Sequence, residues 1–120
     1  MNIINKMTEI IINALEEKKG ESIQVIDISE ISPIADKFII SNGMNRNQVQ
    51  AMADCVEENM HKQGFSLKQV EGYDGGNWIL MDFSDVVVHI FDSESRSFYD
   101  LERIWKDGKI IDLSEFRRIE

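Results

Sequence analysis

The segment Val86–Phe91 constrains the fold more than any other, because it is apolar at nearly every position. A strand with one solvated face alternates apolar and polar residues, whereas a strand covered on both faces is apolar almost throughout. We therefore predict that Val86–Phe91 is a central strand of a sheet with helices packed on it. The segment Trp78–Phe83 precedes it, and the two residues Ser84–Asp85 between them are short enough for a tight hairpin.

Apolar residues at helical spacing predict three helices. The first begins near residue 3 and has Gly20 as its C-terminal cap. The second begins after Asn45, which starts a capping box, and ends at Gly64. The last begins near Asp92 or Ser93 and presents Phe98, Leu101 and Trp105 on one face.

Three further segments are predicted to be strands: Ile23–Ile28, Phe38–Ser41 and Phe65–Glu71. The resulting order, α-β-β-α-β-β-β-α, predicts an α/β (α+β) fold with a mixed β-sheet flanked by helices. A chain of 120 residues fits a single domain. We place this domain at residues 1–108 and a C-terminal tail at 109–120, where the alternatives are a short strand, a docked tail or disorder.

Composition limits the kinds of protein that this chain can be. No apolar run approaches the ~20 residues of a membrane span. The start of the chain lacks the features of a signal peptide, so we expect a cytoplasmic protein with no membrane association. The single cysteine, Cys55, rules out an internal disulfide, and its place in the second helix indicates a core residue rather than a nucleophile.

Acidic residues outnumber basic ones, 22 to 13, which gives a formal net charge of −9. This excess argues against direct, sequence-specific binding of nucleic acid and favours a basic protein partner. The stretch from Gln69 to Ser95 contains no Lys or Arg. It contains six acidic residues, namely Glu71, Asp74, Asp82, Asp85, Asp92 and Glu94.

The aromatic residues of this stretch suit a binding surface. Trp78 follows a glycine-containing loop and is either a core residue or an interface anchor, since Trp and Tyr are enriched among binding hot spots. Arg96 is the first base after the stretch, and an ion pair with Asp92 and Asp100 is its alternative role. The candidate partner-binding residues are Trp78, Asp82, Phe83, Asp85, Arg96 and Tyr99.

Residues that could support catalysis form only one weak group. Asp82, Asp85 and His89 could bind a metal or act as acid and base. However, Asp85 occupies a turn position that favours aspartate, and a histidine between two apolar residues is more typical of a sheet. No phosphate-binding or zinc motif is present. We therefore predict no catalytic residue, no metal and no cofactor.

The segment WILMDFSDVVVHIFDSESRSFYDLERIW resembles the signature of the Iojap-like ribosomal silencing factors. The pattern falls on Trp78, Asp82, Asp85, Val86, Val87, Val88, His89, Glu94, Arg96, Tyr99, Leu101, Glu102 and Trp105. The upstream stretch SPIADKFIISNGMNRNQVQAMAD is similar to the family's first block, so the resemblance covers roughly residues 3 to 107. Ser84 departs from the usual Gly and Asn47 from a common Arg.

The resemblance implies a nucleotidyltransferase-like fold without the catalytic motif of those enzymes. It also implies a non-enzymatic factor that binds the large ribosomal subunit through its basic protein L-fourteen. There the factor blocks association with the small subunit and represses translation under nutrient limitation. A role in late large-subunit biogenesis, and a homodimer of the free protein in some members, are further implications.

Two other hypotheses remain from the residues alone. One is an enzyme, either a degenerate nucleotidyltransferase or a metal-dependent hydrolase that uses Asp82, Asp85 and His89. The other is a general dimerisation module, which would not sediment with ribosomes.

Overall fold

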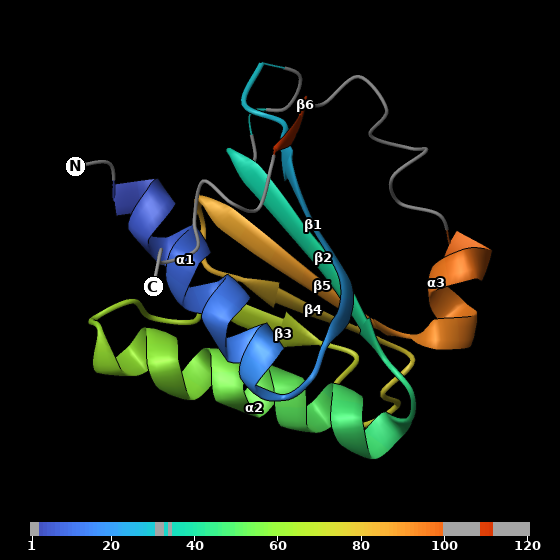
Figure 1. Ribbon diagram of the computed structural model, residues 1–120. Helices are drawn as coiled ribbons and strands as arrows, with labels where there is room; N and C mark the ends of the chain where they lie inside the picture. Colours follow the sequence, from blue (N-terminus) through green and yellow to red (C-terminus); the bar gives the residue numbers. More distant parts are fainter. Residues whose placement is uncertain (1–2, 31–32, 34, 100–108, 112–120) are drawn as a thin grey trace, which may run out of the picture.

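The computed structural model describes residues 3–30, 33, 35–99 and 109–111, and these residues form a six-stranded mixed sheet with three helices (Figure 1). The strands are β1 (Glu21–Asp27), β2 (Lys37–Gly43), β3 (Gln69–Glu71), β4 (Trp78–Asp82), β5 (Val86–Asp92) and β6 (Lys109–Ile111). The helices are α1 (Ile3–Glu17), α2 (Arg46–Lys62) and α3 (Ser93–Tyr99). The order of strands across the sheet is β3-β4-β5-β2-β1-β6.

Strand β5 lies inside the sheet, which confirms the prediction for its apolar sequence. It pairs in parallel with β2 on one side and antiparallel with β4 on the other. Every residue from Val86 to Phe91 is buried. Alternation along the strand sends Val86, Val88 and Ile90 toward one core cluster, and Val87 and Phe91 toward another.

Helices α1 and α2 pack side by side on one face of the sheet (Figure 1). Their apolar residues recur at helical spacing and are fully buried against the sheet, as with Ile11 and Leu15 of α1 and Met52 and Val56 of α2. None of the described helices has both the length and the apolar character needed to cross a membrane.

The opposite face of the sheet carries the second core cluster. Its buried members are Ile26, Ile28, Ala35, Phe38, Ile40, Val87 and Phe91. Trp78 and Leu80 of β4 are only partly buried, and they pack against this cluster from the β3–β4 side of the sheet.

The end of α1 differs from the prediction. The residue in the left-handed conformation is Lys19, with φ of 61°, and not Gly20. Gly20 is required for space instead, because a Cβ there would lie 2.7 Å from Cε of Met52 and 2.9 Å from Oγ of Ser41. Gly20 therefore allows the chain to pass close to α2 and β2.

The start and end of α2 are as predicted. Asn45 is the N-cap, and its Oδ1 accepts a hydrogen bond of 2.9 Å from the amide of Gln48. The side-chain amide of Gln48 also donates to the carbonyls of Lys18 and Lys19, which joins the start of α2 to the end of α1. Gly64 follows the helix with φ of 87°.

Three other boundaries differ from the prediction or lie partly outside the described residues. The predicted strand Phe65–Glu71 is shorter, because only Gln69–Glu71 pairs with β4. Residues 109–111 form β6, antiparallel to β1, whereas residues 112–120 lie outside the described part, so a tail over 109–120 stays a prediction. Helix α3 begins at Ser93 as expected, but Leu101 and Trp105 of its predicted apolar face also lie outside the described residues.

The hairpin between β4 and β5 turns at Ser84 and Asp85 as predicted, but β4 ends at Asp82, so Phe83 also lies between the strands. Asp82 pairs with Val87, and the amide of Phe83 donates to the carbonyl of Val86 at 3.0 Å. Ser84 adopts φ of 75°, a left-handed conformation that is strained for a residue with a Cβ. Its amide donates to Oδ1 of Asp82 at 2.7 Å, which holds the turn despite the strain.

We predict that Ser84→Gly raises the free energy of unfolding by about 0.5 kcal/mol, because glycine removes the strain and keeps the amide bonded to Asp82. Urea denaturation measures the change. The matched control is Ser66→Gly, at an exposed loop residue that is not among those with positive φ. This control should only lose stability, since glycine adds backbone entropy to the unfolded chain. Equal losses in both variants would contradict the role given to Ser84.

Candidate docking face

Alternation along β4 places three residues on the sheet face opposite α1 and α2. Ile79 and Met81 are buried in the cluster beneath the helices, so Trp78, Leu80 and Asp82 point the other way. The register of the β3–β4 pair adds Gln69 opposite Asp82 and Glu71 opposite Leu80. Directly opposed residues of an antiparallel pair lie on the same face. We call Gln69, Glu71, Trp78, Leu80 and Asp82 the candidate docking face.

Trp78 is packed on its inner side and partly exposed on its outer side. Its indole ring stacks on Phe91, with ring centroids 5.1 Å apart and an interplanar angle of 27°. Its Nε1–H donates a hydrogen bond of 3.1 Å to Nδ1 of His89. Trp78 therefore contacts the core and still presents surface, and its role as an interface anchor stays a prediction.

His89 lies beneath Trp78 and is only 3% exposed. Its ring also meets Phe38 edge-on, with centroids 4.6 Å apart. Burial lowers the pKa of His89 from 6.5 to about 4, because the charged imidazole would lose its hydration. Since Nδ1 accepts from Trp78, the proton of the neutral ring is on Nε2, which has no hydrogen-bond partner within the described part of the chain.

Carboxylates lie along β4 and its turn: Asp82 ends the strand that Trp78 begins, and Asp85 lies in the turn that follows. Asp82 is partly exposed, and Asp85 and Glu71 are exposed. The backbone carbonyl of Asp85 accepts from the amide of Asp36 at 2.8 Å, which ties the turn to the start of β2 and leaves the Asp85 side chain toward solvent. This arrangement can meet a basic surface without moving the backbone.

The grouping of Asp82, Asp85 and His89 does not form a metal site. Asp82 is used in the turn, Asp85 is exposed at its tip, and Nδ1 of His89 is occupied by Trp78. Within the described residues, no three His, Cys, Asp or Glu side chains come together in a way that could hold a metal ion.

Two of the candidate partner-binding residues have surroundings different from those expected, and a third is not described. Phe83 is 4% exposed within the cluster beneath the helices, so it packs the core and offers no surface to a partner. Arg96 donates to the carbonyl of Ser22 and to Oδ1 of Asn42, which joins α3 to β1 and β2. The backbone of Tyr99 ends α3, but its side chain lies outside the described part of the chain.

Asp92 caps α3 through a hydrogen bond of 2.7 Å from the amide of Ser95 to its Oδ1. Asp92 thus has a capping role, its ion pair with Arg96 stays a prediction, and Asp100 lies outside the described residues. Leu80 and Glu71 belong to the docking face but were not among the candidates. The two-residue alternation from Trp78, together with the pairing of β3, is the signal that identifies them.

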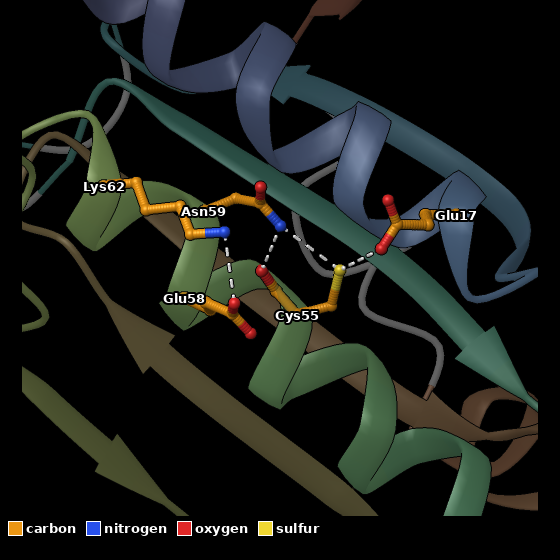
Figure 2. A network of polar contacts seen from close by, with 5 residues as sticks. All are labelled: Glu17, Cys55, Glu58, Asn59 and Lys62. Carbon is orange, nitrogen blue, oxygen red and sulfur yellow. Dashed lines mark hydrogen bonds and ion pairs between the residues drawn. The ribbon is translucent and has the colours of Figure 1, made fainter.

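Cys55 lies away from this face, between α1 and α2 (Figure 2). Its Sγ–H donates to Oε2 of Glu17 at 3.1 Å, and its carbonyl accepts from Nδ2 of Asn59 at 2.8 Å. Burial, followed by the hydrogen bond to Glu17, raises the pKa of the thiol to about 11. The cysteine is 5% exposed and, as predicted, is a core residue rather than an activated nucleophile.

Comparisons with known proteins give a consistent result. The model of the family "Ribosomal silencing factor during starvation" (RsfS) matches residues 2–120. A ribosomal silencing factor from Halalkalibacterium halodurans is 37% identical over 108 residues, which cover 90% of this chain and 92% of the relative. A crystal structure of a Chromobacterium violaceum protein superposes with a TM-score of 0.85 at 33% identity, and the match covers 88% of each chain.

A more distant relative from mouse is named "Mitochondrial assembly of ribosomal large subunit protein 1". It is 26% identical over 101 residues, which cover 81% of this chain and 44% of the mouse protein.

We predict that stability falls as the pH drops from 6.5 toward 4, by up to about 3 kcal/mol from His89. The unfolded chain takes up a proton on His89 at its ordinary pKa of 6.5, whereas the folded chain resists it until a pH of about 4. The contribution of His89 to the free energy of unfolding is therefore fully present above pH 6.5 and is lost as the pH falls toward 4. Urea denaturation between pH 7.5 and 4.5 measures the slope, which His89→Leu should reduce. His61→Gln is the control, because His61 is exposed on α2 and should leave the slope unchanged.

Proposed function

We propose that this chain, which belongs to the ribosomal silencing factor family, binds the large ribosomal subunit through its basic protein L-fourteen. In this proposal the bound protein prevents association with the small subunit and thereby represses translation when nutrients are limiting. The mode of action is steric, so it requires a docking surface and no reacting group.

The observation that carries the choice of surface is the partly exposed Trp78 beside Leu80, on a sheet face that also carries Glu71 and Asp82 and ends at the exposed turn residue Asp85. Aromatic side chains supply much of the binding energy of protein interfaces, and acidic side chains attract a basic partner and suppress others. The stretch from Gln69 to Ser95 contributes no positive charge that would oppose such a partner.

The proposal extends to two further roles. The name of the mouse relative supports a contribution to late large-subunit biogenesis, which uses the same subunit as the binding target. A homodimer of the free protein, in which a second copy covers the docking face, would keep Leu80 and Trp78 from solvent. We propose that the protein acts in the cytoplasm.

The first test is sedimentation through a sucrose gradient with purified ribosomal particles. We expect the protein to sediment with large subunits, but not with small subunits or intact monosomes, because it occupies a joining surface. Equal recovery with all three particles would indicate non-specific adhesion and contradict the proposal. Binding should weaken only moderately between low and physiological salt, since aromatic burial is not screened. A steep loss would instead identify ribosomal RNA as the main contact.

The second test changes the docking face itself. We expect Trp78→Ala to weaken binding to purified L-fourteen by about 2 kcal/mol or more, roughly thirtyfold. Asp85→Lys should weaken it comparably by placing like charges together, and the exposed position of Asp85 should leave the melting temperature unchanged.

The matched control is Glu57→Lys, which makes the same charge change at an exposed position of α2, on the helix-covered side of the molecule. It should bind like the parent protein. Thermal unfolding of every variant separates lost binding from lost folding. If folded Trp78→Ala and Asp85→Lys proteins both bind like the parent, the interface lies elsewhere.

A further inference from the structure

We propose that His89 is a positioning residue of the docking face, which holds the indole ring of Trp78 in the one orientation that the partner binds. This role rests on the proposed function of that face. It concerns a buried side chain that does not touch the partner itself.

The chemistry of β5 first points to His89. His89 is the only residue with a polar side chain from Val86 to Phe91. It is 3% exposed, and its Nε2–H finds no hydrogen-bond partner among the residues that the structure describes. Burying an unpaired donor costs free energy that an apolar side chain of similar size would not. A residue that breaks the local pattern at a cost to stability is expected where function requires it.

The geometry shows what the histidine contributes. Stacking on Phe91 sets the plane of the Trp78 indole but accepts the ring in either of two orientations, related by a half-turn about its bond to Cβ. The hydrogen bond from Nε1 to Nδ1 of His89 distinguishes them, because only one orientation directs the N–H inward.

The partial exposure of Trp78 makes this choice necessary. In a fully buried site the indole would be held by packing alone, whereas here the N–H could turn outward and bond to water. Phe38 meets the imidazole edge-on from β2, so the acceptor itself is held between two rings on neighbouring strands. A preoriented anchor loses less freedom on binding, which increases affinity without adding a contact.

The experiment compares two substitutions that separate stability from positioning. His89→Leu fills the site and removes the acceptor. His89→Asn keeps an oxygen near the place of Nδ1 but leaves a cavity. We expect His89→Leu to be at least as stable as the parent at pH 7, yet to bind purified L-fourteen about five- to tenfold more weakly, the contribution of one hydrogen bond. His89→Asn should be less stable but bind more tightly than His89→Leu.

Two further measurements identify the hydrogen bond as the cause. Trp78→Phe keeps a ring and removes the N–H, so adding His89→Leu to it should weaken binding no further. In the free protein, hydrogen exchange of the indole N–H should be slow in the parent and fast in His89→Leu. The signal is assigned by its absence from Trp78→Phe, which distinguishes it from that of Trp105.

The outcomes separate failure of the positioning role of His89 from failure of the docking face. If Trp78→Ala binds weakly but His89→Leu binds like the parent, positioning is wrong and the docking face stands. If binding follows stability across the His89 variants, the histidine is structural and the inference fails. If Trp78→Ala also binds like the parent, both the face and its positioning residue are wrong. The exchange measurement needs no partner, so rapid exchange in the parent overturns the inference even where binding fails.

Discussion

Burial of β5 on both faces is the constraint on which the rest of this structure depends. A strand that is apolar on both sides needs helices over one face and a second apolar cluster over the other, and both are present. Its register with β4 then places Trp78 opposite Phe91 and Leu80 opposite His89. The contacts that support the docking face therefore depend on the neighbouring strand β5 as much as on β4 itself.

In the proposed docking face, packing and recognition use the same side chains. The inner side of Trp78 completes a core cluster, while its outer side is available to a partner. The carboxylates of Asp82 and Asp85 lie at a turn, where exposure costs no desolvation and where the backbone of Asp85 is tied to β2. Because the face is built on paired strands, its shape is set before any partner arrives.

Features that depend on residues close together in the sequence were predicted from the sequence. The central strand, the hairpin and both ends of α2 follow from periodicity, turn chemistry and capping. The burial of Phe83 was also readable, since alternation from Trp78 assigns it to the other face. By contrast, the partners of Arg96 and the space needed at Gly20 involve residues far away in the sequence. Such contacts exist only once the fold is complete, so no local signal marks them.

The parallel pairing of β2 with β5 also has a consequence for how the chain matures. The central strand is made after α1, β1, β2 and α2, and these elements cannot close the sheet without it. Pairing across so long a separation is slow and cooperative, because loop closure comes before any gain from contact. A nascent chain that ends before residue 86 therefore has neither a centre for its sheet nor a surface for Trp78. The candidate docking face therefore forms only after the central strand has been made and has paired with β4.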